Sequence, residues 1–77
     1  MKIYIKYFAS VRDVMGKHSE DLDVENNLTV DRLWVKLTLN LQIKMKVMFA
    51  VNHKYVDKDF KLKQGDEIAF FPPVTGG

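Results

Sequence analysis

Cysteine is missing from the 77 residues of this sequence. Its absence excludes disulfides, thiolate metal sites and cysteine nucleophiles, so a core this small has to be held by packing or by a partner. The two histidines, His18 and His53, cannot form a zinc site by themselves. We expect both at the surface, and we expect no metal site.

Long hydrophobic runs are also missing. The longest uncharged apolar run covers residues 68–74 and falls far short of the roughly 20 residues of a membrane helix. The N-terminal MKIYIKYF alternates and does not form a signal-peptide core. We therefore expect no membrane association and a cytoplasmic location, with one folded domain in a chain of this length.

The charge of +2 at neutral pH is small but unevenly distributed. Residues 20–31 carry five acidic residues and no Lys or Arg, whereas residues 32–63 carry eight basic and two acidic residues. The lysines stand singly among apolar positions, without the basic run or interleaved aromatics of single-strand binders. This pattern favours a solvated face and no nucleic-acid partner.

Hydrophobic alternation predicts several short strands. In residues 1–8, Ile3, Ile5 and Tyr7 alternate with polar side chains, as in a strand with one buried face. The expected strands are residues 1–8, 18–24, 47–51, 55–56 and 67–71, with turns at 52–54 and 63–66. Ser10 with Asp13 has capping-box spacing, and Gly16 suits a helix end, so a short helix is predicted over residues 11–15.

The middle of the chain supports two interpretations. Thr29 is a good N-cap, and apolar residues at helical spacing predict a main helix over residues 30–40. Residues 35–47 also alternate, which taken alone indicates a long strand. The cap and the scarcity of turn residues favour the helix, with Trp34 packed inward and Val35 and Leu39 left on its outer face. The helical stripe comprises Val30, Leu33, Trp34, Leu37 and Leu41.

The end of the sequence combines stiffness with a slim tip. Pro72 and Pro73 hold the backbone extended, and Gly76 and Gly77 present a backbone without side chains. A frayed terminus is the ordinary alternative. An apolar strand, a double proline and a double glycine in this order indicate an arm that inserts into a narrow active site.

Residues 66–77, DEIAFFPPVTGG, resemble the C-terminal signature of the MoaD/ThiS family of ubiquitin-like proteins, and within it the small sulfur-carrier subunits of molybdopterin synthase. Thiamin-pathway carriers share the glycine end but usually lack the Phe-Phe-Pro-Pro segment. Further similar segments are residues 8–12, 29–30, 50–52 and 55–56. Residues 37–48 depart from the family, being shorter and more strand-like than in relatives.

The resemblance implies an α+β, ubiquitin-like β-grasp fold. Such a fold has a mixed sheet of about four to five strands packed on one main helix, here with a short helix after the first strand. The implied organisation is a β-grasp domain over residues 1–71 and an extended C-terminal tail over residues 72–77.

The resemblance also implies a chemistry for Gly77. A carboxylate is ionised at neutral pH and is a poor electrophile, so a ubiquitin-activating-like adenylyltransferase would use ATP to adenylate Gly77 before a sulfur donor forms a thiocarboxylate. The tail would then enter the large catalytic subunit of molybdopterin synthase, in a heterotetramer of two small and two large subunits, and donate sulfur to cyclic pyranopterin monophosphate. The chain itself would bind no cofactor and would be no enzyme alone.

Two groups of site residues follow from the resemblance. The inserted tail would comprise Pro72, Pro73, Val74, Thr75 and Gly76, ahead of the reacting Gly77. Phe8, Tyr55 and Phe71 occupy positions where the family presents an apolar patch beside the tail, so we expect them to dock partners; for Phe8 and Phe71 the alternative is packing in the core or at an edge. Arg12 would pair with an acidic partner surface or with Asp13.

Other functions remain open from the sequence. One is a sulfur carrier for another pathway, such as tRNA thiolation or thiamin, or a ubiquitin-like modifier conjugated to lysines. Another is a β-grasp interaction module whose glycine end is accidental. A co-purifying pterin-binding large subunit would favour molybdopterin synthase, lysine conjugates would favour a modifier, and neither would favour the plain module.

Overall fold

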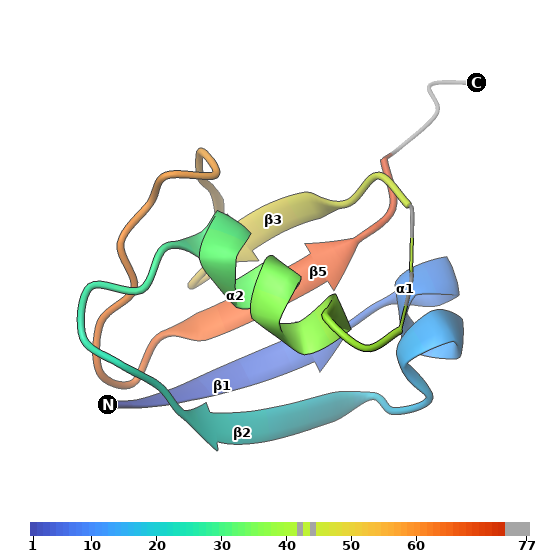
Figure 1. Cartoon of the computed structure of the whole chain (residues 1–77). Helices are drawn as coiled ribbons and strands as arrows, with labels where there is room; N and C mark the ends of the chain where they lie inside the picture. Colours follow the sequence, from blue (N-terminus) through green and yellow to red (C-terminus); the bar gives the residue numbers. More distant parts are fainter. Residues whose placement is uncertain (42, 44, 74–77) are drawn as a thin grey trace.

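A mixed sheet of five strands organises the fold (Figure 1). The computed structural model describes residues 1–41, 43 and 45–73. The sheet has the strand order β2-β1-β5-β3-β4, and α2 lies across one of its faces. This arrangement confirms the expected α+β, β-grasp class. The elements in chain order are β1 (Lys2–Tyr7), α1 (Ala9–Met15), β2 (Ser19–Asp23), α2 (Val30–Thr38), β3 (Met48–Val51), β4 (Lys54–Tyr55) and β5 (Glu67–Phe71).

The last strand, β5, lies between β1 and β3 in the sheet. It runs parallel to β1, from the pair Tyr4 and Glu67 onward, and antiparallel to β3. Beyond the paired residues, the N–H of Phe8 donates to the carbonyl of Phe70 at 3.1 Å. The C-terminal ends of β1 and β5 therefore meet at one end of the sheet, so that Phe8 and Pro72 follow from adjacent strands.

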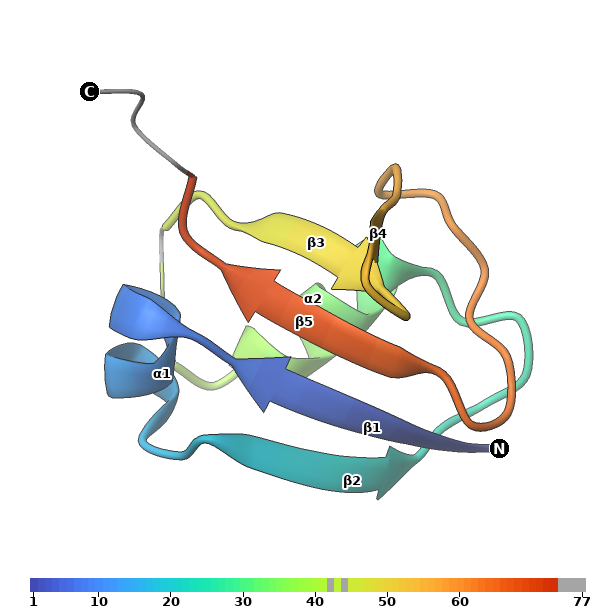
Figure 2. The same cartoon turned by 180° about the vertical axis from the view of Figure 1, so that it is seen from behind.

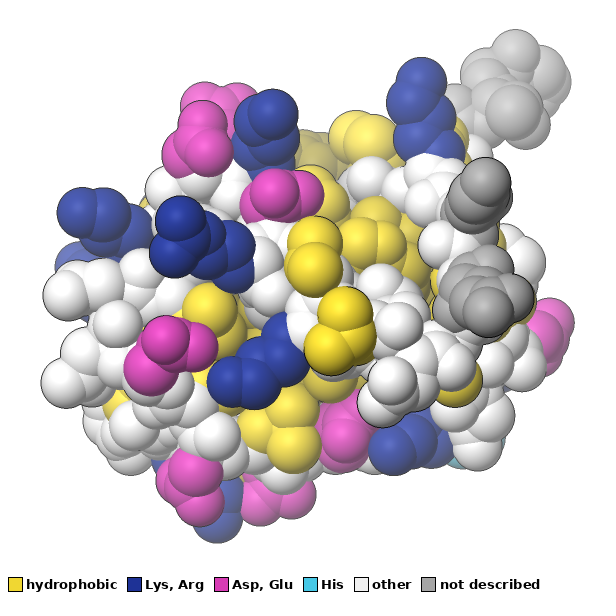
Figure 3. Space-filling model, in the orientation of Figure 1, with side chains coloured by type: hydrophobic (Ala, Val, Ile, Leu, Met, Phe, Trp, Pro, Cys, Tyr) yellow, Lys and Arg dark blue, Asp and Glu magenta, His cyan; other side chains and the backbone are white. Residues whose placement is uncertain are grey.

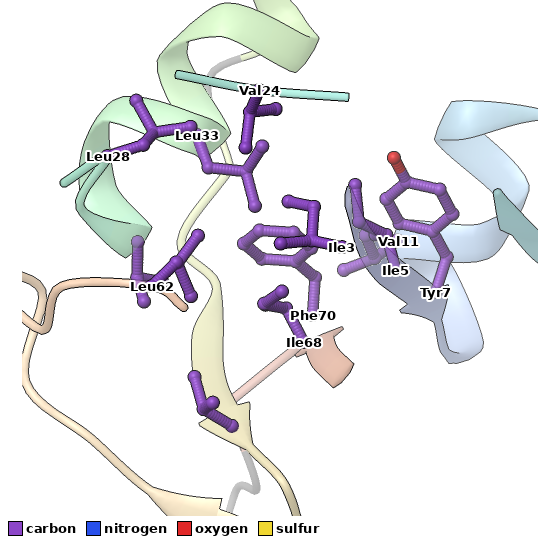
Figure 4. Packing of buried hydrophobic residues seen from close by; sticks show 12 residues of the cluster. Ile3, Ile5, Tyr7, Val11, Val24, Leu28, Leu33, Leu62, Ile68 and Phe70 are labelled. Carbon is purple, nitrogen blue, oxygen red and sulfur yellow. The ribbon is translucent and has the colours of Figure 1, made fainter. Parts of the chain in front are cut away.

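Alternation along β1 and β5 builds the core beneath α2. Ile3 and Ile5 are at most 1% exposed, and Phe70 is fully buried. The Phe70 ring lies at the centre of the cluster (Figure 4), 4.8 Å from the Trp34 ring and 5.6 Å from the Phe49 ring between centroids. Trp34 therefore packs inward, as predicted, and burial of each such side chain contributes about 1.5–3 kcal/mol to folding.

The main helix begins where the sequence predicts and ends earlier. The Thr29 Oγ1 accepts a hydrogen bond from the Arg32 N–H at 3.3 Å, which confirms the N-cap. Helix α2 ends at Thr38, not Asn40, and Leu41 is exposed, so the last position of the predicted stripe is wrong.

Two apolar residues that the helix interpretation leaves on the outside are Val35, on α2, and Leu39, which directly follows the helix. Val35 and Leu39 are exposed, as predicted, and hydrophobic atoms lie at the surface among charged side chains in Figure 3. Among the described residues of the segment 39–47 there is no strand. The strand interpretation of residues 35–47 is therefore wrong.

Helix α1 begins earlier than predicted. It starts at Ala9, and its N-cap is Phe8, whose side chain makes no capping hydrogen bond; the predicted cap of Ser10 with Asp13 is wrong. Phe8 takes this position because its N–H belongs to the contact with β5, while its carbonyl accepts from the Val11 N–H at 3.1 Å. Gly16 closes the helix in the left-handed conformation with a φ of 73°, as expected.

Other boundaries shift by one or two residues. β1 and β2 are each one residue shorter at both ends than predicted, and β3 begins at Met48 instead of residue 47. The turn before β4 needs only Asn52 and His53, which have φ values of 51° and 70°, so Lys54 already pairs with Val51. β4 therefore comprises Lys54–Tyr55 instead of residues 55–56. β5 has the predicted bounds, whereas the division of the chain at residue 71 stays a prediction.

Candidate functional site

Figure 2 looks onto the outer face of the sheet, opposite α2. On this face a depression of about 310 Å³ lies near the end of β5. It exists because two small residues, Ala50 on β3 and Ala69 on β5, are direct cross-strand partners. Larger side chains from neighbouring strands surround this low point. The lining comprises Lys6, Phe8, Ala50, His53, Tyr55, Glu67, Ala69 and Phe71.

Three aromatic residues border the depression, and all three were predicted to dock partners. Phe8 is 47% exposed and Tyr55 is 74% exposed, and the Tyr55 ring meets the half-buried Phe71 ring with centroids 5.9 Å apart. Neither Phe8 nor Phe71 belongs to the buried core. Exposed aromatic side chains gathered around a depression are typical of protein interaction sites, although their part in docking stays a prediction.

Charged groups also line the same depression. The Glu67 carboxylate is 3.5 Å from the Lys6 Nζ and 3.9 Å from the His53 Nε2. The Lys6 side chain is 50% exposed, and an exposed ion pair of this kind contributes at most about 1 kcal/mol to stability. His18 and His53 are both exposed, as expected. Because Lys6 and His53 are exposed, a partner could reach the charged group around Glu67 from solvent.

Arg12 lies in a neighbouring hollow and not in the depression itself. It projects from α1 and shares this second hollow with Lys6, Phe8 and His18. Within the described part of the chain its guanidinium makes no ion pair, so the structure does not show the alternative of pairing with Asp13, and pairing with an acidic partner surface stays a prediction. Phe8 borders both hollows and therefore connects Arg12 to the aromatic surface, which is formed by Phe8, Tyr55 and Phe71.

A buried carboxylate, which the sequence did not reveal, holds the start of β5. Asp66 is 8% exposed; its Oδ2 accepts from the Lys63 N–H at 2.8 Å, and its Oδ1 accepts from the Asn52 Nδ2 at 3.0 Å. Asn52 in turn accepts the Glu67 N–H on its Oδ1 at 3.0 Å. These bonds join the β3–β4 turn to the turn around Gly65 and thereby fix β5. The sequence predicts turns that contain Asn52 and Asp66, but it does not show that these two side chains bond each other.

A second polar contact fixes the end of β1 beside Phe8. The Tyr7 Oη donates to the Glu20 Oε2 at 2.6 Å, and Lys17 Nζ lies 3.3 Å from the other Glu20 oxygen. Burial, and secondarily the hydrogen bond to Glu20, raise the pKa of Tyr7 far above its usual value of 10.0. Tyr7 is therefore a neutral donor that ties β1 to β2 at this end of the sheet.

The predicted tail starts beside the aromatic surface. Pro72 is half-buried and Pro73 is exposed, directly after Phe71. The other predicted tail residues, Val74, Thr75, Gly76 and Gly77, lie outside the described residues, as do Gln42 and Lys44.

Two further features of the described residues bear on the earlier expectations. In that part of the chain, no three His, Asp or Glu side chains are grouped so that they could hold a metal ion. Neither of its two helices is long and apolar enough to cross a bilayer.

Comparisons with known proteins agree with this arrangement. A molybdopterin synthase sulfur carrier subunit from Haemophilus influenzae is 53% identical over 95% of this chain and 96% of its own length. A solved structure from Pyrococcus furiosus, assigned to subunit 1 of molybdopterin converting factor, has a TM-score of 0.83 and 29% identity, covering 96% of this chain and 99% of that one. Small archaeal modifier protein SAMP1 from Haloferax volcanii shares the fold, with a TM-score of 0.79, 24% identity and complete coverage of both chains.

The model of the ThiS family matches residues 5–77, which include both the β-grasp elements and the glycine end. The match covers nearly the entire chain, and the curated relative from Haemophilus influenzae shares more than half of its residues with it. The chain therefore belongs to the ThiS family, within the MoaD/ThiS group of ubiquitin-like proteins that its C-terminal residues resemble.

Proposed function

We propose that this chain is the sulfur-carrier subunit of a molybdopterin synthase and that the carboxylate of Gly77 carries the sulfur. The observation that carries the proposal is the 53% identity, over nearly the full length of both chains, to a relative of that name. The likeness to SAMP1, at 24% identity, shows a shared fold and does not favour a modifier.

The first step of the proposed chemistry is activation of Gly77. Its carboxylate attacks the α-phosphate of ATP in the active site of a ubiquitin-activating-like adenylyltransferase, and pyrophosphate leaves. Hydrosulfide delivered by a sulfur donor then attacks the acyl carbon, AMP leaves, and loss of the S–H proton gives a thiocarboxylate. Without a cysteine in the sequence, the terminal group is the sulfur store of this chain, and its soft sulfur is a good nucleophile at neutral pH.

The second step is transfer in the large catalytic subunit. Each thiocarboxylate donates one sulfur to cyclic pyranopterin monophosphate and returns to a carboxylate at Gly77, so two loaded chains supply the two sulfurs of the molybdopterin dithiolene. This chain contributes position and not catalysis: Pro72 and Pro73 keep the tail extended, and Gly76 leaves room for a narrow channel. We propose a complex of two small and two large subunits.

The aromatic surface is the proposed docking site for both partners. Phe8, Tyr55 and Phe71 surround a depression at the end of the strand that leads into the tail. A partner that covers these rings therefore also receives the residues that follow Phe71. Arg12, unpaired in the described part of the chain, would meet an acidic group at the rim of that interface.

Deletion of Gly77 tests the proposal. We expect the shortened chain to fold normally, because β5 ends at Phe71, and to accept no sulfur from the adenylyltransferase, ATP and a sulfur source. Intact mass spectrometry would measure replacement of oxygen by sulfur, with the full chain as the positive control. Sulfur transfer to the shortened chain, or dithiolene formation with it, would contradict the proposal.

Gly76→Ala is the finer variant of this experiment. It keeps the length and the terminal carboxylate, and it adds one Cβ where we expect the channel to admit only backbone. We expect nearly complete loss of turnover in the assembled synthase. Normal turnover would show a wider channel and would leave the role of Gly77 unaffected.

A further inference from the structure

The two edges of the sheet differ in how well they are protected from pairing with a strand of another chain. β2 forms one edge, and three of its five residues are acidic, namely Glu20, Asp21 and Asp23. Charged side chains on an edge strand discourage pairing with another chain. β4 forms the other edge but has two residues, which pair with Ala50 and Val51. Among the described residues, the first half of β3, Met48 and Phe49, has no strand neighbour on that side.

The pairing pattern shows which backbone groups are open there. The Asn52 N–H donates to the Glu67 carbonyl at 2.8 Å, so in an antiparallel ladder the alternate residues Ala50 and Met48 also direct their backbone groups toward β5. The backbone groups of Val51 and Phe49 face the opposite side, where Val51 meets Lys54. No described residue provides a backbone partner for Phe49 there, so one donor and one acceptor remain at the edge.

An open, largely apolar groove of about 890 Å³ lies beside this unpaired stretch. Its lining residues come from β3, from β4 and from the loop that leaves the sheet after Tyr55. Figure 2 shows the path of these three elements. Met48 is 41% exposed and Phe60 is 36% exposed, so both present apolar surface to solvent. The lining comprises Val47, Met48, Phe49, Tyr55, Val56, Asp57, Lys58, Asp59 and Phe60.

We infer that the large subunit of the synthase adds an extended segment of its own to this edge, beside Met48 and Phe49, in line with β4. The inference rests on the proposed function, because it names the same partner. Backbone hydrogen bonds to Phe49 would supply affinity, and alternate apolar side chains of the segment would fill the groove. Tyr55 lines both this groove and the depression on the outer face, so one partner can cover both.

The charges of the groove define the segment further. Asp57 and Asp59 line it, with Lys58 between them, and none of the three forms an ion pair within the described part of the chain. The excess of acid favours a segment that carries a Lys or Arg among its apolar residues. A second copy of this chain would bring the same acidic excess to the contact, so self-pairing through this groove is disfavoured.

Amide hydrogen exchange tests strand addition at a single residue. The full ¹⁵N-labelled chain would be measured by NMR alone and saturated with the large subunit. In the free chain we expect the Phe49 amide to exchange faster than the paired Val51 amide, and in the complex we expect it to slow at least about tenfold. Val51, already paired with Lys54, is the internal control.

The other outcomes are distinguishable. If the large subunit binds and Phe49 exchange stays unchanged, strand addition is overturned and the proposed function stands. If the large subunit does not bind at all, the proposed function is overturned together with the partner named here. Protection of Phe49 that rises with the concentration of the free chain would overturn the inference in favour of self-association.

A matched pair of variants tests the groove. Phe60→Lys places in it a positive charge that repels the Lys or Arg of the segment, whereas Phe60→Leu keeps an apolar side chain, and the thermal midpoint and NMR spectrum of each would establish folding. We expect Phe60→Lys to weaken binding of the large subunit at least about tenfold and Phe60→Leu to weaken it less than about threefold. Equal affinity of a folded Phe60→Lys variant and the unaltered chain would contradict the inference. If Phe60→Lys does not fold, the exchange experiment on the unaltered chain decides.

Discussion

The two faces of the sheet use the same strands for different purposes. On β5, Ile68 and Phe70 point toward α2 and are fully buried, whereas Ala69 and Phe71 point to the outer face and are half-buried. The two-residue period of a strand thus places a core residue and a surface residue next to each other in sequence. We therefore expect Phe70 to contribute mainly to the free energy of unfolding, and its neighbour Phe71 mainly to the free energy of binding a partner.

Phe70→Ala should show the largest effect on the inner face. The ring is fully buried against Trp34, Phe49 and Tyr7, and removing such a side chain leaves a cavity that costs about 3–5 kcal/mol of unfolding free energy. Urea unfolding followed by tryptophan fluorescence would measure the loss. A loss below about 1 kcal/mol would place Phe70 outside the core.

Phe71→Ala should show the converse behaviour on the outer face. We expect the complex with the large subunit to weaken by about 2 kcal/mol, because apolar anchors at interface centres contribute this much. Unfolding free energy should fall by less than the binding free energy, since Phe71 is half-buried and lies outside the core. Calorimetric titration and urea unfolding of one preparation give both quantities. Equal losses would show that the two faces do not separate stability from docking.

Tyr7→Phe should show the smallest effect, and it depends on pH. Losing the bond to Glu20 should cost about 1 kcal/mol at neutral pH. Because folding raises the Tyr7 pKa above its ordinary 10.0, the folded chain retains this proton where the unfolded chain releases it. The stability from the neutral form is therefore complete below about pH 10 and lost above it, by about 1.4 kcal/mol per pH unit.

Comparison of the two chains isolates the Tyr7 contribution. Urea unfolding between about pH 9 and about pH 11 should show a steeper decline of stability for the unaltered chain than for Tyr7→Phe. All other side chains are the same in both chains, so their contributions cancel in the difference. Parallel declines would show that Tyr7 titrates in the folded chain as it does in the unfolded chain.

Strong alternation and helix capping made much of the fold predictable. β5 has the predicted bounds, and the expected buried residues Ile3, Ile5 and Tyr7 are in the core. Thr29 caps α2 as expected because its hydroxyl bonds a residue three positions along the chain. These features depend on local geometry, which sequence spacing records directly.

The errors arise where distant segments decide the local structure. Helix α1 starts at Ala9 because Phe8 is tied to Phe70, a contact between opposite ends of the sequence. Asp66 ends the predicted turn, and its N–H donates to the Lys63 carbonyl at 3.0 Å, but the sequence did not reveal that its carboxylate also accepts a bond from Asn52. The spacing of residues along the sequence could not show that the β3–β4 turn lies against the turn around Gly65.

The candidate site was predictable only in part, because it too depends on contacts between distant segments. The resemblance pointed to Phe8, Tyr55 and Phe71, and the structure brings all three around one depression. It places Arg12 on a neighbouring hollow, and the groove beside β3 had no sequence signal of its own. That groove depends on the short length of β4 and on the path of the loop after Tyr55, which only the folded chain reveals.

The central position of β5 has a consequence for protein synthesis. β1, at the start of the sequence, reaches β3 in the sheet only through β5, near its end. A chain that stops before residue 67 lacks the strand that joins the two halves, together with Ile68 and Phe70 at the centre of the core. Native assembly must therefore wait until residues 67–71 have left the ribosome. A nascent chain with an unfinished sheet accordingly lacks residues 72–77, the tail that we propose is activated, so the fold can be complete as soon as that tail is available.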